Sequence, residues 1–397
     1  MKYVVLVPDG AADYPQESLD GKTPLEAAHT PNMDRLAREG SGGMVQIIPE
    51  VRPPGSDIGN LELFGYDSVE QYTGRAPLEA ASMGVELPEG AIAFRCNLIN
   101  CEGDTLVDYS AGHISTEEGQ ELIRLVAAEL EEKGIRFYPG VQYRHLMVYQ
   151  DGPEELVSYP PHDIMGESAS GHLPTGEGQE KIRELMAAAE PILARAEVNA
   201  KRVAAGQRPG NHIWLWGSGR GIELESFASK SGLCGGVISA VDLVRGIGRS
   251  AGLEVIEVPG ITGYLDTNYA GKASYALAAL ERSDFVYVHV EAADEAAHNG
   301  DPQAKVQALE DFDRLVVGNI IEGLGTLGEC RLLMAPDHRT PIQLRTHSRE
   351  PVPFVLWGSD FPADGMQGFN ETAAEAGSLQ LERGHHMMEH LMGRRSI

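Results

Sequence analysis

Two strand-like runs and two helix-like segments alternate within the first 75 residues, and this alternation restricts the fold more than any other feature of the sequence. Residues 3–7 are continuously apolar and rich in β-branched side chains, which is typical of a strand buried on both faces. A helix is predicted for 31–39, a strand for 41–49 and a second helix for 60–64. Because this order of strands and helices builds parallel sheets, we expect an α/β fold.

A stretch of different character separates two α/β parts of the sequence. Residues 91–100 and 105–109 are predicted to be paired strands around a Glu-Gly-Asp turn. The α/β rhythm resumes after about residue 232, and the strand-like run 211–216 is interpreted as the return crossing. We therefore expect a discontinuous α/β domain at 1–75 and 206–397, with an α+β domain inserted at 76–205.

The inserted stretch contains an internal repeat, which indicates a domain built from two half-units. The segment 112–124 recurs as 171–183 with most positions identical, and each copy has a Gly-His turn before an amphipathic helix. Repeated capping of the helix, by Thr116 in the first copy, explains the repeated Thr, Glu and Gln without any ligand. Capping does not explain the repeated Gly-His. His113 and its counterpart His172 are therefore candidate anion contacts near a helix N-terminus.

The composition excludes several classes of partner. The formal net charge is −27, and because nucleic acids and anionic membranes both need cationic surfaces, neither is expected to bind. The four cysteines show no C-x-x-C spacing, which is typical of reduced thiols in the cytoplasm. Residues 1–10 are too short and too strand-like for a signal peptide, and no apolar stretch approaches a membrane span. We expect a cytoplasmic enzyme that is a monomer or a small homo-oligomer.

A strand-to-helix turn places one hydroxyl in an unusual position. Two prolines and Gly55 end an extended run, and Ser56 and Asp57 follow where a helix can begin. Such a turn exposes the Ser56 hydroxyl and surrounds it with free backbone N–H groups, which suit a phosphate. A lone Ser-Asp after Pro-Gly is more simply interpreted as an N-cap. Potential ligands elsewhere in the chain favour the functional interpretation.

These potential ligands mostly lie just past predicted strands. Asp9 ends the first apolar run, and Asp337 and His338 follow the run 331–336. The full set is three aspartates and three histidines: Asp9, Asp294, Asp337, His298, His338 and His347. Because ligands bind at the carboxyl ends of the strands in an open parallel sheet, we expect these side chains to meet. Carboxylates, imidazoles and one hydroxyl suit a site for two ions of Mn²⁺ or Zn²⁺.

The same residues occur in motifs that resemble those of a known family. The motifs are Val7-Pro8-Asp9-Gly10, Pro54-Gly55-Ser56-Asp57, Leu63-Phe64-Gly65-Tyr66, Asp294-x-x-x-His298, Pro336-Asp337-His338 and His347. They span nearly the whole chain and resemble, in the same order, those of the archaeal-type cofactor-independent phosphoglycerate mutases of the alkaline-phosphatase superfamily. The resemblance implies an alkaline-phosphatase-like, doubly wound, mostly parallel sheet with an inserted α+β domain.

The resemblance also implies a ligand set and a reaction. One divalent ion would be held by Asp9, Ser56, Asp337 and His338, and the other by Asp294, His298 and His347. Mn²⁺, Zn²⁺ or Mg²⁺ is expected, and 2,3-bisphosphoglycerate is not. Ser56 would take the phosphoryl group of a small phosphorylated substrate as a phosphoserine. Transfer of this phosphoryl group from Ser56 to the other hydroxyl of the same glycerate would interconvert 3-phosphoglycerate and 2-phosphoglycerate.

Three positions depart from the pattern of the family. At the position of His113 the archaeal-type mutases have arginine, although the neighbouring residues are similar. At the positions of Trp216 and Glu291 they have arginine and lysine, respectively. None of the three side chains present here replaces a guanidinium fork. The other candidate contacts for the charged substrate are basic residues: Arg75, Arg95, Arg220, Arg245, Lys230 and Lys272.

The departures leave an alternative substrate open. A subgroup of the family resembles this chain at those positions and has been proposed to be a homoserine kinase. Glu291 could receive the α-ammonium group of an amino acid, but no nucleotide-binding motif is present to supply a phosphoryl donor. A metal-dependent phosphomonoesterase is a further alternative, which hydrolysis without an acceptor would reveal. We expect the mutase.

Overall fold

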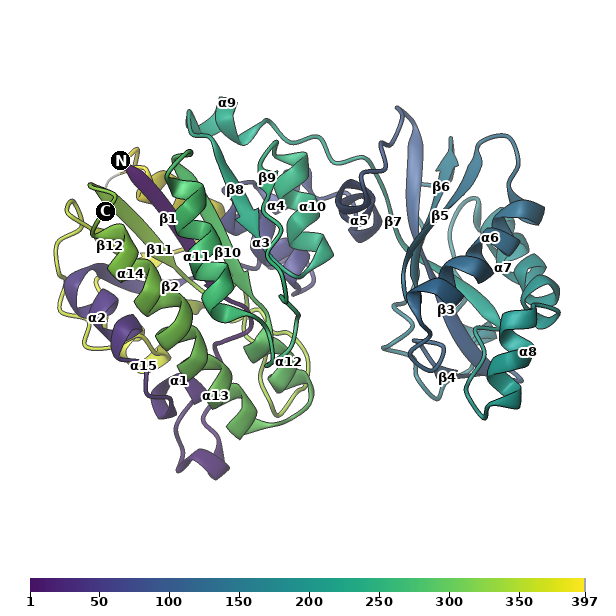
Figure 1. Cartoon of the computed structure of the whole chain (residues 1–397), viewed down its shortest axis with the longest axis horizontal. Helices are drawn as coiled ribbons and strands as arrows, with labels where there is room; N and C mark the ends of the chain where they lie inside the picture. Colours follow the sequence, from purple (N-terminus) through teal and green to yellow (C-terminus); the bar gives the residue numbers. More distant parts are fainter. Residues whose placement is uncertain (396–397) are drawn as a thin grey trace. The chain divides into compact units, whose positions relative to one another are not determined.

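The computed structural model describes residues 1–395, and the chain divides into two compact units. The first unit contains Met1–Tyr72 and the chain from Glu223 onward, and the second contains Thr73–Ile222 (Figure 1). No helix among the described residues has both the length and the apolar character needed to cross a membrane.

The first unit is built on a mixed sheet of eight strands in the described chain. In sheet order the strands are β13 (Leu379–Leu381), β2 (Ser41–Val45), β12 (Val352–Gly358), β11 (Cys330–Met334), β1 (Lys2–Pro8), β10 (Phe285–Val290), β8 (Gly235–Ile238) and β9 (Glu254–Val255). The five strands from β11 to β9 are mutually parallel, whereas β12 is antiparallel to both of its neighbours. The predicted α/β class with a mostly parallel sheet is confirmed.

Strand β1 is the centre of this sheet and of its core. It lies between β10 and β11, and Val4–Val7 are completely buried, as their continuous apolar character predicts. The helices of the unit are α1 (Pro24–Ala27), α2 (Pro31–Glu39), α3 (Ser56–Leu63), α4 (Ser68–Gln71), α9 (Phe227–Ser231), α10 (Asp242–Ser250), α11 (Tyr269–Leu280), α12 (Ala292–His298), α13 (Pro302–Asp311), α14 (Gly318–Leu324), α15 (Glu371–Glu375) and α16 (Met387–Leu391). A π-helical segment, Phe312–Val317, joins α13 to α14.

The second unit is an antiparallel sheet with helices packed on it. Its strands are β3 (Ala91–Glu102), β4 (Thr105–Asp108), β5 (Ile135–Val141), β6 (Arg144–Gln150) and β7 (His212–Arg220). Strand β3 pairs with β4, β6 and β7, and β5 pairs with β6. The helices are α5 (Arg75–Met83), α6 (Thr116–Leu130), α7 (Gln179–Ala194) and α8 (Glu197–Ala204). The larger of two hydrophobic clusters draws on α6, α7, β3 and β7.

The boundaries between the two units differ from the predicted domain boundaries. The prediction assigned residues 206–222 to the first domain, but Ile213–Trp216 of β7 pair with β3 of the second unit, from Leu98 to Arg95. The apolar alternation of 211–216 gave the strand correctly, but its partner lies more than a hundred residues earlier and the local sequence does not identify it. On the N-terminal side the units divide between Tyr72 and Thr73, close to the predicted residue 75.

Both copies of the internal repeat lead into a helix, and the two helices, α6 and α7, pack together. Their caps differ from the prediction. Ser115, rather than Thr116, caps α6 in a capping box with Glu118, and Gly178 precedes α7 without any side-chain cap. The repeated sequence therefore specifies two amphipathic helices but does not specify two identical N-termini.

Candidate metal centre

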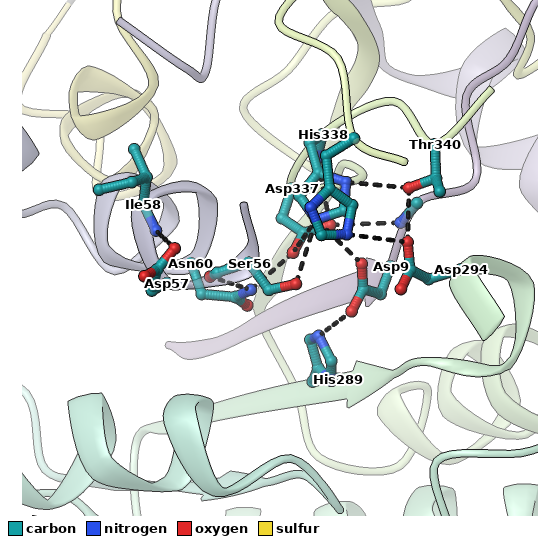
Figure 2. A network of polar contacts seen from close by, with 12 residues as sticks. Asp9, Ser56, Asp57, Ile58, Asn60, His289, Asp294, Asp337, His338 and Thr340 are labelled. Carbon is teal, nitrogen blue, oxygen red and sulfur yellow. Dashed lines mark hydrogen bonds and ion pairs between the residues drawn. The ribbon is translucent and has the colours of Figure 1, made fainter. Parts of the chain in front are cut away.

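The potential ligands converge at the carboxyl ends of three neighbouring parallel strands. Asp9 follows β1, Asp337 follows β11, and Asp294 lies in α12 directly after β10. Since β11, β1 and β10 are adjacent in the sheet, these three carboxylates come together as predicted (Figure 2). Gly10 makes the turn after β1 with φ of 62°, and a Cβ there would lie 2.6 Å from Asp294 Oδ1. The turn therefore requires glycine.

Ser56 is the first residue of α3, and its hydroxyl points toward the carboxylates instead of capping the helix. Its Oγ lies 3.1 Å from Nε2 of His338. Gly55 occupies the N-cap position and supplies no side-chain bond. Asn60, one turn later, donates from Nδ2 to the carbonyl of Ser56 and to Oδ2 of Asp337, at 2.8 and 2.7 Å. Asn60 therefore ties the Ser56 turn to the end of β11.

Asp9 is a completely buried carboxylate that receives no hydrogen bond at either oxygen. His289 Nε2 lies 3.0 Å from Oδ2, and His338 Nε2 lies 3.5 Å from Oδ1. Burial and the neighbouring Asp337 and Asp294 carboxylates raise the pKa of Asp9 well above its ordinary value of 3.8. An unsatisfied buried carboxylate is costly unless a cation neutralises it, so this arrangement fits a bound metal ion.

The histidines nearby carry little positive charge that could neutralise Asp9. Burial lowers the pKa of His289 to about 4, and burial together with the neighbouring His347 holds the pKa of His338 well below its ordinary value of 6.5. Both imidazoles are therefore neutral at pH 7. Neutral imidazole is the form that ligates metals.

A second group of ligand atoms surrounds Asp294. Its Oδ2 lies 3.2 Å from His298 Nε2, and its Oδ1 lies 3.6 Å from His347 Nε2. The two Nε2 atoms are 3.1 Å apart, and His298 Nδ1 contacts the carbonyl of Arg345 at 2.9 Å. Burial raises the pKa of Asp294, but its contacts with His298 and His347 outweigh burial and hold it well below 3.8. Two imidazole nitrogens and a carboxylate that face one point form a suitable set of ligands for a divalent ion.

The described residues thus form two overlapping sets of candidate ligands. One set is the group Asp294, His298 and His347. The other set is centred on Asp9, which forms one group with His289 and Asp337 and another with Asp294 and His338. Within each of these three groups the ligand atoms lie within 4.8 Å of one another. Three buried carboxylates and four imidazoles can hold two divalent cations, and such cations would activate a nearby hydroxyl and neutralise a phosphoryl group.

Another cluster of ligand-type side chains shows why satisfied hydrogen bonds matter. Glu62, Asp67 and His385 also lie within reach of a common ion. The buried Glu62 carboxylate, however, accepts bonds from Ser68 and from the backbone and ring of His385. Both of its oxygens are hydrogen-bonded to protein groups, so this cluster is a structural polar network.

Sequence reasoning missed three members of the main site: Asn60, His289 and Thr340. His289 lies inside the run 284–290, which reads simply as a buried strand. Thr340 donates from Oγ1 to Asp294 Oδ1 at 2.5 Å and lies 3.1 Å from His338 Nδ1 (Figure 2). The spacing Asp337-x-x-Thr340 carried no motif that could have identified the threonine.

The predicted substrate contacts are divided between the two units. Lys272 and Glu291 belong to the first unit. Lys272 is completely buried in α11 and donates from Nζ to the carbonyl of His289 at 2.7 Å. Burial lowers the pKa of Lys272 to about 8, although the Glu291 carboxylate opposes that shift.

The other three contacts, His113, Arg75 and Arg220, belong to the second unit, which does not bring all of them together. Arg220 pairs with Ile92 at one end of β3, whereas His113 follows β4, whose Asp108 pairs with Asn100 near the other end. Eight residues of strand correspond to about 26 Å. Arg220 and the strand that leads to His113 therefore lie toward opposite ends of β3.

Arg75 instead lies beside another arginine. Arg95 is almost fully buried, with its guanidinium carbon 4.3 Å from the centre of the Trp216 ring, and the guanidinium of Arg75 lies 5.8 Å from the same ring. Glu79 pairs with Nε of Arg95 at 2.9 Å. Trp216, at a position where arginine was expected from the family, thus supports two arginines with its aromatic face.

Comparison with known proteins gives consistent matches. The family model for 2,3-bisphosphoglycerate-independent phosphoglycerate mutase matches residues 37–199. A probable 2,3-bisphosphoglycerate-independent phosphoglycerate mutase of Geobacter sulfurreducens is 51% identical, with 99% of this chain and 100% of the relative aligned. The mutase 2 of Methanothermobacter thermautotrophicus is 50% identical over 99% of this chain and 97% of its own.

Solved structures give the same match for the fold. A Pyrococcus horikoshii protein superposes with a TM-score of 0.83 at 28% identity, over 100% of this chain and 98% of its own. The cofactor-independent phosphoglycerate mutase of Thermoplasma acidophilum superposes with a TM-score of 0.67 at 27% identity, over the full length of both chains.

Proposed function

We propose that this chain interconverts 3-phosphoglycerate and 2-phosphoglycerate, because it belongs to the family of 2,3-bisphosphoglycerate-independent phosphoglycerate mutases. The observation that carries the proposal at the level of residues is the 3.1 Å contact between Ser56 and His338 at the edge of a buried carboxylate cluster. This is a hydroxyl placed beside a potential proton acceptor and beside candidate metal ligands.

We propose that two divalent ions complete the site. Asp9, Ser56, Asp337 and His338 would hold one ion, and Asp294, His298 and His347 would hold the other. The ions, when bound, would lower the pKa of the Ser56 hydroxyl and neutralise the phosphoryl oxygens. The unsatisfied oxygens of Asp9 support an ion at that position, and the ligand types favour Mn²⁺ or Zn²⁺.

The residues of the chain perform the remaining steps. Ser56 Oγ attacks the phosphorus of the substrate, and the bond from phosphorus to the glycerate oxygen breaks as the phosphoserine forms. The second hydroxyl of the retained glycerate then attacks the phosphoserine and releases Ser56. The first turn of α3 provides backbone N–H groups for the transferred phosphoryl group, because Gly55 places no side chain over them.

Retention of the glycerate separates a mutase from a phosphatase, and it requires cations for the carboxylate and phosphate of the substrate. We propose Lys272, which belongs to the same unit as Ser56, for this purpose. Arg220 is a weaker candidate because it is largely exposed and pairs with Glu154 at 3.4 Å. His113 is also exposed, and Glu291 carries the wrong charge for an anion.

The homoserine kinase alternative rests on His113, Trp216 and Glu291, where the sequence departs from the mutase pattern. Full-length relatives with about half of their residues identical to this chain are named as mutases, which favours the mutase over the kinase. We further propose that the protein acts in the cytoplasm on a small phosphorylated substrate, as a monomer or a small homo-oligomer.

A parallel assay of three reactions tests the proposed function. Protein loaded with Mn²⁺ is given 3-phosphoglycerate, or ATP with L-homoserine, and release of inorganic phosphate is followed in both. We expect rapid formation of 2-phosphoglycerate, little free phosphate and no phosphohomoserine. Ser56→Ala should abolish the reaction, whereas Ser359→Ala, at an exposed serine of the same unit, should not. Phosphohomoserine without 2-phosphoglycerate would overturn the proposal.

A further inference from the structure

We infer that Thr340 is a positioning residue that fixes the proton of His338 on Nδ1 and joins the two sets of candidate ligands. Its hydroxyl contacts Asp294 Oδ1 at 2.5 Å and His338 Nδ1 at 3.1 Å (Figure 2). Asp294 belongs to one proposed ion site and His338 to the other. The inference deepens the proposed function and rests on it.

The direction of each hydrogen bond follows from counting protons. A threonine hydroxyl has one proton to donate, and an ionised carboxylate can only accept. Thr340 therefore donates to Asp294, and its oxygen accepts from the neighbouring imidazole nitrogen. His338 must then carry its proton on Nδ1, since a neutral imidazole has only one.

The consequence lies on the other side of the imidazole ring. With the proton on Nδ1, Nε2 of His338 presents a lone pair 3.1 Å from Ser56 Oγ and 3.5 Å from Asp9 Oδ1. That lone pair can ligate an ion or accept the proton of Ser56. The opposite tautomer would direct an N–H at the same point and block both roles.

The backbone of Thr340 is held by a completely buried ion pair. Lys305 Nζ donates to the Thr340 carbonyl at 2.9 Å and to Asp13 Oδ2 at 2.8 Å. The Thr340 N–H donates to the carbonyl of Ala12 at 3.2 Å. The loops that follow β1 and β11 are therefore fastened together at this residue.

The side chain of Thr340 has no room to turn away. It is completely buried, and a Cβ on Gly10 would lie 2.5 Å from its Oγ1. A threonine that only filled this space could be replaced by valine, which has the same shape and no hydroxyl. This difference separates the positioning role from a packing role.

The test compares Thr340→Val with Thr340→Ser, which restores the hydroxyl, and with Thr326→Val at an exposed turn. Mn²⁺ binding to each protein is measured by electron paramagnetic resonance, and kcat and KM are measured for 3-phosphoglycerate. We expect Thr340→Val to weaken Mn²⁺ binding by about 10–100-fold and to lower kcat more than it raises KM. Thr340→Ser should recover most of both losses, and Thr326→Val should behave as wild type.

A second measurement reads the tautomer in the wild-type protein and uses a variant only to assign the signal. Long-range proton–nitrogen correlation spectra of the metal-free protein report which ring nitrogen of His338 carries the proton, with the signal assigned by its loss in His338→Gln. The expected result is the Nδ1–H tautomer. The Nε2–H tautomer would overturn the inference.

The outcomes separate failure of this inference from failure of the proposed function. If wild-type protein binds Mn²⁺ and interconverts the phosphoglycerates while Thr340→Val does both equally well, the positioning role is wrong and the function stands. If wild-type protein neither binds Mn²⁺ nor converts substrate, the proposed function is wrong and the role of Thr340 falls with it.

Discussion

Asp9 Oδ2 and His289 Nε2 lie 3.0 Å apart in the centre of the sheet edge, and both side chains are completely buried. Neither oxygen of Asp9 receives a hydrogen bond. Because burial keeps His289 neutral, the histidine does not compensate the charge of the carboxylate. A cation at this position would stabilise the folded protein, and its removal would leave an uncompensated charge.

Asp9→Asn should therefore have opposite effects with and without metal. The asparagine has no charge to bury, and its amide can donate to Asp337. The free energy of unfolding of the metal-free variant should therefore be about 1–3 kcal/mol higher than that of the metal-free wild type. Mn²⁺ should raise the melting temperature of wild type and not of the variant. Asp284→Asn, at a half-exposed aspartate, serves as the control. A destabilised metal-free variant would contradict the account.

The stability of the metal-free protein should fall as the pH rises above 6.5. The pKa values of Asp9 and Asp337 are raised above 3.8, and contact with Asp294 raises the pKa of His298 to about 9 despite burial. The folded state then holds protons that the unfolded chain releases, so stability is lost above pH 3.8 and again between pH 6.5 and about 9. Groups with lowered pKa values have the opposite sign: Asp294 acts below pH 3.8, and His289 and His338 act below pH 6.5. Lys272 opposes the trend only above about pH 8, so the net fall is expected as the pH rises above 6.5.

Metal binding should reverse that trend, because the ligands must lose their protons. Denaturant unfolding at several pH values, with a chelator or with Mn²⁺, measures the difference. We expect the stabilisation by Mn²⁺ to grow with pH up to about 9, and calorimetry in two buffers to detect released protons. Stabilisation that is independent of pH would show that these carboxyl and imidazole groups are not the ligands.

Lys305→Met should destabilise the fold strongly, because it leaves the Asp13 carboxylate charged and buried. Removal of one partner of a buried ion pair costs about 3–5 kcal/mol. The double variant Lys305→Met/Asp13→Asn should cost less than the two single changes together, since it leaves no unpaired charge. Lys201→Met, which breaks the exposed pair with Glu197, should leave the free energy of unfolding nearly unchanged. Additive single costs would argue against the buried pair.

The sequence predicted the ends of the strands better than it predicted the pairing between strands. Asp9 and Asp337 follow continuous apolar runs, and parallel strands with such runs bring their carboxyl ends together. The placement of β7 was missed because antiparallel pairing with β3 depends on contacts across more than a hundred residues. A register of that kind leaves no local signal.

The residues that orient the ligands were also beyond prediction. Asn60 reads as an ordinary helix residue, His289 as a strand residue and Thr340 as a loop residue. Their roles arise only when α3, β10 and the loop after β11 meet, and a single hydroxyl or amide carries no pattern in the sequence. The candidate ligands themselves were found because carboxylates and imidazoles past strand ends are distinctive chemical types.

The most direct test of phosphoryl transfer through Ser56 is to trap the phosphoserine. Protein loaded with Mn²⁺ is mixed with 3-phosphoglycerate, quenched in acid within the first turnover, and digested for peptide mass spectrometry. The account predicts phosphate on Ser56, no phosphate at the same peptide in Ser56→Ala, and a loss of kcat in that variant of about 10⁴-fold or more. Unphosphorylated Ser56 throughout rapid turnover, or full activity in Ser56→Ala, would contradict it.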